Sequence, residues 1–265
     1  MYARPTDEEH RIGLILPSCH TTLESELPEL LRRQRFASDD RFTLHATRLR
    51  LPAPTPQTLA ATLPATEAAI DLLCDAQVDA IVHGCVATVM CAGRGAIHHA
   101  QARMLSHAAS LGRMPPTVLT AAGALLHALE ALHAQRIALI APHASALTAR
   151  LAAVIADHGI EVAATRSLGV SDVSLVGLLA PHNLLPVAAT MDLANCDALV
   201  LSACTQMPSL AVIEEAEQRF GLPVISASTS TAFMLLHRMG IRPQIGHAGL
   251  LLRGLMQPAR DTATC

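Results

Sequence analysis

A strand-like segment near the start of the chain returns in its second half. RIGLILP at 11–17 reappears as RIALIAP at 136–142, with five of seven positions identical. DAIVHGC at 79–85 has a counterpart in DALVLSAC at 197–204, and both copies end in a cysteine. A unit that is used twice in one chain predicts two similar halves related by a pseudo-two-fold axis.

Short apolar runs alternate with longer Ala- and Leu-rich stretches of helical spacing. Runs typical of buried parallel strands lie at 12–16, 78–82, 117–120, 136–141, 198–202 and 223–226. The helical stretches lie at 58–76, 95–111, 122–134, 144–158, 208–220 and 229–239. This alternation predicts an α/β fold in which each half is a parallel sheet flanked by helices. We expect an N-terminal half at 1–120, which residues 225–265 can complete, and a C-terminal half at 121–265.

The composition excludes several classes of protein. The 265 residues are 51% hydrophobic and carry a net charge of −3, which is typical of a globular chain. With 19 basic against 22 acidic residues and no Trp, nothing favours nucleic acid. No apolar run is long enough to span a bilayer, and the polar start MYARPTDEEHR does not resemble a signal peptide. We therefore expect a cytoplasmic protein that binds neither membranes nor nucleic acids.

The repeated cysteines, Cys85 and Cys204, are the strongest candidates for chemistry. Ligands of open parallel sheets bind at the carboxyl ends of the strands, so the two loops should face one cleft between the halves. Two opposed thiols can act on one carbon as nucleophile or base and as acid, without a metal or organic cofactor. The seven cysteines contain no CxxC pair, and we interpret four others as packing residues: Cys74, Cys91, Cys196 and Cys265.

Three longer motifs resemble one known family. RIGLILPSCHTTLESELPELL at 11–31, TAAGALLHALEAL at 120–132 and LSACTQMPSL at 201–210 are similar, in this order, to the maleate cis-trans isomerases. These enzymes belong to the aspartate/glutamate racemase superfamily and are related to the arylmalonate decarboxylases. The resemblance extends from about residue 11 to residue 253, which is nearly the whole chain.

The resemblance implies a cofactor-independent isomerisation of maleate to fumarate. Cys85 would attack the double bond, the succinyl adduct would rotate about the new single bond, and Cys204 would transfer the proton. It also implies a small carboxylate substrate and a homo-oligomer, most simply a dimer. The residues expected to bind the substrate are Ser18, His20, Thr21, His83, Val86, His143, Thr205 and Gln206.

Four pocket positions depart from the family pattern. The family usually has Asn at His20, Tyr at His83 and His143, and a second Asn at Val173. Two alternatives therefore stay open beside the isomerase. One is a racemase or epimerase with two opposed thiols. The other is a metal-binding derivative with imidazole and thiolate ligands. Its candidate ligands are Cys19, His20, His83, Cys85, His143 and Cys204.

Overall fold

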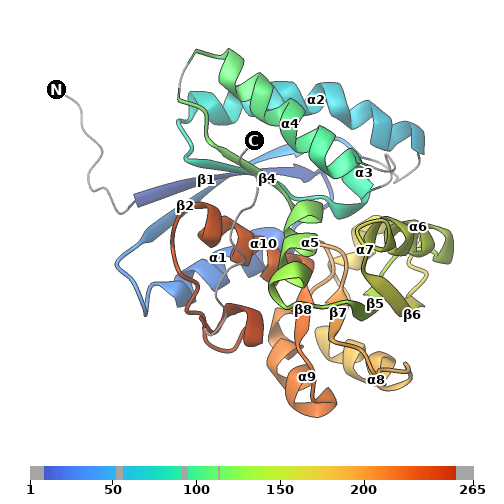
Figure 1. Ribbon diagram of the computed structural model, residues 1–265. Coiled ribbons are helices and arrows are strands. Elements are labelled where there is room, and N and C mark those ends of the chain that lie inside the picture. Colours follow the sequence, from blue (N-terminus) through green and yellow to red (C-terminus); the bar gives the residue numbers. More distant parts are fainter. Residues whose placement is uncertain (1–8, 52–55, 91–94, 113, 255–265) are drawn as a thin grey trace.

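The computed structural model describes residues 9–51, 56–90, 95–112 and 114–254, which form two four-stranded parallel sheets (Figure 1). The first sheet has the order β2-β1-β3-β4, and the second has the order β6-β5-β7-β8. The strands of the first are β1 (Glu9–Pro17), β2 (Arg41–Leu49), β3 (Ala80–His83) and β4 (Thr117–Thr120). Those of the second are β5 (Arg136–Ala141), β6 (Glu161–Ser167), β7 (Ala198–Ser202) and β8 (Val224–Ser226). The shared order confirms the predicted α/β fold of two similar halves.

The repeat extends to individual hydrogen bonds. In the first sheet the backbone N–H of Arg11 donates to the carboxylate of Asp79 at 2.8 Å. In the second sheet Arg136 donates to Asp197 in the same way, also at 2.8 Å. The central strands β1 and β5 and their neighbours β3 and β7 are therefore counterparts, as the sequence repeat predicts.

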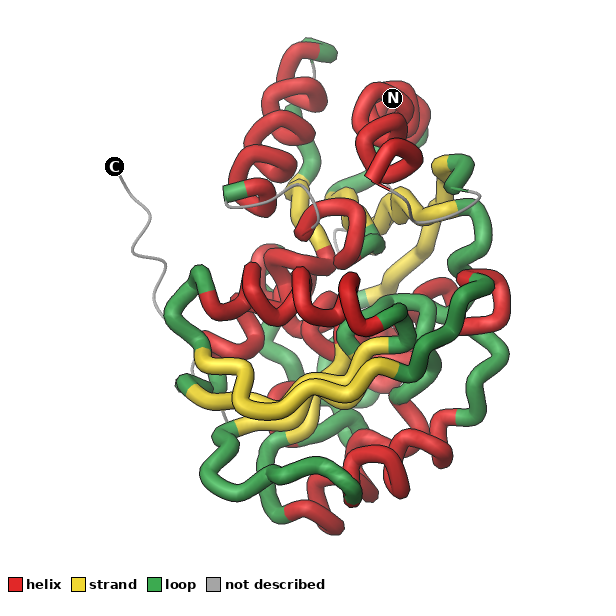
Figure 2. Tube along the Cα trace, turned by 90° about the vertical axis from the view of Figure 1, so that its right-hand side faces the viewer, coloured by secondary structure: helices red, strands yellow, loops and turns green. Residues whose placement is uncertain are grey.

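The helices form three layers around the two sheets. Figure 2 shows the strands as two separate groups with helices between and outside them. The outer face of the first sheet carries α2 (Pro56–Asp75) and α4 (Ala96–Ser110). Between the sheets lie α1 (Leu23–Gln34), α5 (Ala121–Ala131), α6 (Ser145–Ala156) and α10 (Ala227–Arg238). The outer face of the second sheet carries α8 (Leu184–Ala189) and α9 (Ile213–Phe220). Short elements complete the chain: α3 (Val86–Met90), α7 (Val173–Val176) and 3₁₀ turns at Pro181–Asn183, Leu210–Val212 and Leu250–Leu252.

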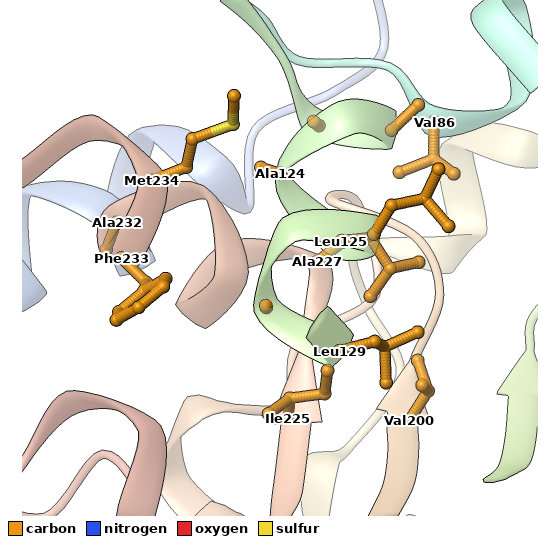
Figure 3. Packing of buried hydrophobic residues seen from close by; sticks show 14 of the residues in the cluster. Val86, Ala124, Leu125, Leu129, Val200, Ile225, Ala227, Ala232, Phe233 and Met234 are labelled. Atoms are coloured by element: carbon orange, nitrogen blue, oxygen red, sulfur yellow. The ribbon is translucent and has the colours of Figure 1, made fainter. Parts of the chain in front are cut away.

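The largest apolar cluster lies between the sheets and contains residues of both halves. On α5, Leu125 and Leu129 are fully buried, and Figure 3 shows Leu129 near Val200 and Ile225 of the second sheet. A helix that is apolar on nearly all sides is one that packs inside a core. Truncating such a leucine to alanine costs about 2–5 kcal/mol, so this shared core holds the cleft in place.

The predicted strands and helices correspond to elements of the structure, but several elements were missed. The strands β2 and β6 lie at the sheet edges, where polar and charged side chains interrupt the apolar pattern. Helix α1 was missed as well, and it contains Pro28.

The chain passes from β4 directly into α5, while α10 packs against α1 and α5. The division at residue 120 remains a prediction. Among the described helices, none is long and apolar enough to cross a membrane.

Candidate active site

The loops that follow β1, β3, β5 and β7 meet at one small cavity of about 20 Å³. All strands of both sheets are parallel, so the carboxyl ends of the central strands point to this region. The cavity is lined by Cys19, His20, Leu51, Cys85, Val86, Ala87, His143, Val173 and Cys204. Both repeated cysteines thus line the same space, one from each half.

Cys85 lies between the end of β3 and the start of α3 and is 3% exposed. The hydroxyl of Thr88, one turn further along, donates to its Sγ at 3.0 Å. A hydrogen bond to sulfur favours the charged thiolate, which is the nucleophilic form. The preceding Gly84 lets the chain pack closely, because a Cβ there would lie 2.4 Å from a methyl carbon of Leu16 and force that side chain to move.

Cys204 follows β7 and is 6% exposed. Burial, opposed by a backbone hydrogen bond from Gln206 and assisted by the neighbouring Cys85, raises the pKa of its thiol to about 12. That amide donates to the sulfur at 3.5 Å. The hydroxyl of Ser202 donates to the Cys204 carbonyl at 2.9 Å and holds the loop. At neutral pH this thiol is protonated and can act as an acid.

Three predicted substrate-binding residues tie the loops together instead of lining the cavity. Thr205 donates from its hydroxyl to the carbonyl of Gly84 at 2.7 Å, which connects the two cysteine loops. The side-chain oxygen of Gln206 accepts from the backbone of Thr21 at 2.7 Å. Its amide nitrogen donates to the carbonyl of Cys19 at 2.8 Å. The hydroxyl of Thr205, the side-chain amide of Gln206 and the backbone N–H of Thr21 are therefore already engaged in joining the halves.

Two imidazoles line the cavity, and both are held neutral. Burial and the nearby His143 together lower the pKa of His20 to about 4. Burial lowers the pKa of His143 to about 4 as well. Val173 faces the same cavity. Lys, Arg, Asp and Glu are absent from the lining described above, so the site is formed by thiols, neutral imidazoles, backbone and apolar groups.

Two other predicted residues lie away from the cavity. Ser18 is exposed, and its hydroxyl accepts from the backbone of Leu51 at 3.3 Å. His83 is buried, but it lines a different cavity on the α2 and α4 side of the first sheet. Side chains alternate between the faces of a strand, so His83 shares its face with Ile81, while Val82 faces the layer between the sheets.

The metal alternative finds no support in this geometry. In the described ranges, no three His, Cys, Asp or Glu side chains lie close enough together to hold one ion. Cys19, His20, Cys85, His143 and Cys204 all line the thiol cavity, whereas His83 is separated from it.

Sequence reasoning missed Thr88, the residue that contacts the Cys85 sulfur directly. Thr88 comes three residues after the cysteine at the start of a helix, so its side chain could have been expected one turn away, beside the sulfur. The lining residues Leu51 and Ala87 had no polar group that could have marked them.

The site is a two-cysteine cleft between two parallel sheets, and the comparisons assign it to a family. The family model described as arylmalonate decarboxylase matches residues 12–252. Over 245 residues, the chain is 38% identical to maleate isomerase of Geobacillus stearothermophilus, covering 92% of this chain and 97% of that one. The chain therefore belongs to this family of the aspartate/glutamate racemase superfamily, and it is an enzyme of the isomerase branch.

Solved structures agree with this assignment. A cysteine-to-alanine variant of maleate isomerase from Pseudomonas putida S16, crystallised with maleate, aligns with a TM-score of 0.91 and 33% identity. The alignment covers 94% of this chain and 99% of that one. A cysteine-to-serine mutant of the Nocardia farcinica maleate cis-trans isomerase carries a covalently bound succinylcysteine intermediate. It aligns with a TM-score of 0.89 and 36% identity, over 92% of this chain and 98% of that one.

Proposed function

We propose that the protein isomerises maleate to fumarate through a covalent adduct on Cys85. The observation that carries the proposal is that Cys85 and Cys204 line one cavity in chemically different surroundings. Environments that separate the proton affinities of two groups define an acid and its partner. The similarity to maleate isomerases over more than nine-tenths of the chain supports the substrate class.

In the proposed first step, the Cys85 thiolate adds to one carbon of the double bond. The electron pair of that bond moves to the neighbouring carbon, which takes the proton of the Cys204 thiol. The product is a succinyl thioether whose central carbon–carbon bond is now single and can rotate. The thiol with a pKa of about 12 supplies the proton, since it is fully protonated at neutral pH.

The second step reverses the first after rotation. The Cys204 thiolate removes the proton from the same carbon, the double bond re-forms in the trans arrangement, and the bond to Cys85 breaks. No atom is gained or lost, so no cofactor is consumed. The succinylcysteine seen in the Nocardia farcinica relative is the adduct that this sequence of steps requires.

The carboxylates would be bound by neutral donors. The side chains of His20 and His143 line the cavity, and Val86 and Ala87 follow Cys85 at the start of α3, where backbone N–H groups lack helical partners. A bound dianion stabilises imidazolium, so substrate binding should raise the pKa of both histidines from about 4. A cavity of about 20 Å³ has room for about one water, so the surrounding loops must move apart to admit the substrate.

The test is the turnover of maleate, followed by proton NMR on the freshly purified protein with its metal content measured in the same sample. Formation of fumarate that Cys85→Ser abolishes would establish the reaction. A protein that leaves maleate unchanged under these conditions would not be a maleate isomerase.

Proton NMR in deuterated solvent distinguishes the racemase alternative from the isomerase. A racemase exchanges the proton next to a carboxylate of a chiral substrate, so it would incorporate deuterium from solvent into such a substrate without converting maleate. Exchange on aspartate or a hydroxy acid, together with inert maleate, would move the assignment to that branch.

A further inference from the structure

One acidic residue of α1, Glu26, lies on the buried side of its helix and is 8% exposed. It interrupts a row of leucines there, since the buried residues of the helix are Leu23, Glu26, Leu27, Leu30, Leu31 and Gln34. The proposed isomerisation does not use it. Glutamate is almost never buried unless it is paired, because the loss of hydration has to be offset by hydrogen bonds or opposite charge. The position of Glu26 therefore calls for partners inside the protein.

The partners of Glu26 belong to the loop that carries Cys204. Its Oε1 accepts from the backbone N–H of Ser209 at 2.7 Å and from that of Leu210 at 2.8 Å. These two residues end the irregular segment that begins at Cys204 and lead into the turn at Leu210–Val212. Burial raises the pKa of the Glu26 carboxyl, against the hydrogen bonds from Leu210 and Ser209. Without this carboxyl two buried N–H groups would lose an acceptor, so the loop would have to move to satisfy them.

The first part of the same loop is bound to the start of α1. Thr22, one turn before Glu26, donates from its hydroxyl to the carbonyl of Gln206 at 2.7 Å. The side-chain oxygen of Gln206 accepts from the N–H of Thr22 at 3.2 Å. The helix thus holds the loop at two places, near Cys204 through Gln206 and at the far end through Glu26. Because α1 begins shortly after His20, it also connects this loop to another part of the cavity lining.

We propose that Glu26 is a positioning residue for the acid of the reaction, because it fixes the loop that places the Cys204 thiol opposite Cys85. The inference rests on the proposed function, in which Cys204 supplies the proton to the carbon next to the one that Cys85 attacks. Glu26 lies outside the lining of the thiol cavity, so it acts through the loop alone. A displacement of about 1 Å in a reacting group can lower a rate about 10²-fold, so this proton transfer depends on a loop held at both ends.

The first test needs no substrate and compares the alkylation of the two thiols by iodoacetamide. Glu26→Leu continues the row of leucines and removes the acceptor, whereas Glu26→Gln keeps an oxygen that can accept from both N–H groups. In Glu26→Leu the released loop should expose Cys204 and speed its labelling roughly tenfold, since a fall of about one unit in a thiol pKa gives about ten times as much thiolate. The rate at Cys85 should stay within about twofold. Glu26→Gln should restore slow labelling of Cys204.

Glu217→Leu is the matched control, since Glu217 is a largely buried carboxylate of α9 in the other half. It accepts from the backbone of Val224 at 3.1 Å and of Leu250 at 2.8 Å, and neither residue belongs to a cysteine loop. It should leave both alkylation rates unchanged. A merely structural role for Glu26 would speed both thiols together through partial unfolding. Equal acceleration of both cysteines, the same change in the control, or no rescue by Glu26→Gln would overturn the proposal.

The second test measures maleate turnover by the same variants. Glu26→Leu should lower kcat roughly tenfold to a hundredfold and change KM less than about threefold, because the acid acts on substrate that is already bound. Glu26→Gln should retain most of kcat. An unchanged kcat, or a loss confined to KM, would contradict the proposal. If the wild-type protein leaves maleate unchanged, the proposed function fails, and the alkylation rates alone decide whether Glu26 positions Cys204.

A shorter side chain keeps the proposal testable if Glu26→Leu does not fold. Glu26→Asp retains the charge but withdraws the oxygens from the loop by one methylene. It should speed the alkylation of Cys204 in the same direction by a smaller factor, with the rate at Cys85 unchanged. Wild-type labelling of both cysteines in a folded Glu26→Asp protein would then overturn the proposal.

Discussion

The two cysteine loops share a backbone design and differ in what surrounds each sulfur. After β3, the N–H of Gly84 donates to the carbonyl of Ile15 at 2.9 Å. After β7, the N–H of Ala203 donates to the carbonyl of Ile140 at 3.0 Å. The same hydrogen bond to the central strand therefore positions the residue before each cysteine. The duplicated unit fixes where the thiols lie.

The difference arises from the residues that follow. Downstream of Cys85 the chain enters α3, and Thr88 supplies a hydroxyl to the sulfur. Downstream of Cys204 the chain stays irregular until the turn at Leu210–Val212. There the sulfur accepts from backbone N–H groups, that of Gln206 at 3.5 Å and that of Met207. A symmetric scaffold thus holds one thiol beside a hydroxyl donor and another whose pKa is raised by burial, which suits a nucleophile and an acid.

The largest expected effect comes from replacing each thiol in turn. Cys85→Ser and Cys204→Ser should each lower maleate turnover by roughly 10³-fold or more, since nucleophile and acid are both required. The variants should differ in mass spectrometry after incubation with maleate. Cys204→Ser retains the nucleophile and should accumulate a succinyl group on Cys85, whereas Cys85→Ser should remain unmodified.

The matched control is Cys74→Ser, a buried cysteine on the far face of the first sheet. It should keep near-normal turnover. If either Cys85→Ser or Cys204→Ser retained near-normal rates, the two thiols would not form one catalytic pair.

The next effect is a difference in alkylation. With a pKa of about 12, only about one Cys204 thiol in 10⁵ is ionised at neutral pH, and the thiolate is the reactive form. Iodoacetamide should therefore label Cys85, whose sulfur accepts from the Thr88 hydroxyl, faster than Cys204, and maleate should slow the reaction. Peptide mapping of the alkylated protein measures both rates. Faster labelling of Cys204 would reverse the assigned roles.

A smaller effect should follow from removing the hydroxyl that distinguishes the first loop. Thr88→Val keeps the shape of the side chain but cannot donate to sulfur. A hydrogen bond to a charged group contributes about 1.5–3 kcal/mol, so alkylation of Cys85 at neutral pH should slow by roughly tenfold to a hundredfold. Thr88→Ser restores the donor and should recover most of the rate. Equal rates for valine and serine would assign the residue a packing role only.

The two similar halves and the positions of their cysteines could be predicted from the sequence because the repeated segments are apolar, buried strands. Buried central strands such as β1 and β5 have few acceptable compositions, so their patterns stay recognisable. The edge strands β2 and β6 have no such constraint, because solvent accepts charged side chains there, and both were missed. The placing of the two cysteines at one cleft followed from the repeat and from the rule that ligands bind at the carboxyl ends of parallel strands.

The side-chain directions could not be predicted in the same way. Thr205 and Gln206 were expected at the substrate, yet their polar groups join the loops. His83 was expected beside Cys85, but the alternation along β3 turns it to the opposite face of the sheet. A motif identifies which residues lie near a site. The direction in which each side chain points depends on backbone angles, which the spacing of residues in the sequence does not give.

The smallest expected effect concerns the neutral histidines of the two halves, His20 after β1 and His143 after β5. Each has a folded-state pKa of about 4, below the ordinary value of 6.5. Between these values the unfolded chain binds a proton that the folded chain does not, so the folded state loses stability as pH falls from 6.5 toward 4. Above 6.5 both states are neutral and the histidines contribute no pH dependence. Each histidine should add a slope of about 1.4 kcal/mol per pH unit within that window.

Urea unfolding at several pH values across this window measures the slope. His20→Leu and His143→Leu should each flatten it by a similar amount, since both imidazoles are buried and have a pKa of about 4. Leu178→Ala, at an exposed position without a titratable group, is the control and should leave the slope unchanged. A flattening seen for His20→Leu but not for His143→Leu would show that the similarity of the halves ends at the strands. The imidazoles, like the thiols, would then differ in their surroundings although they lie on corresponding loops of the two halves.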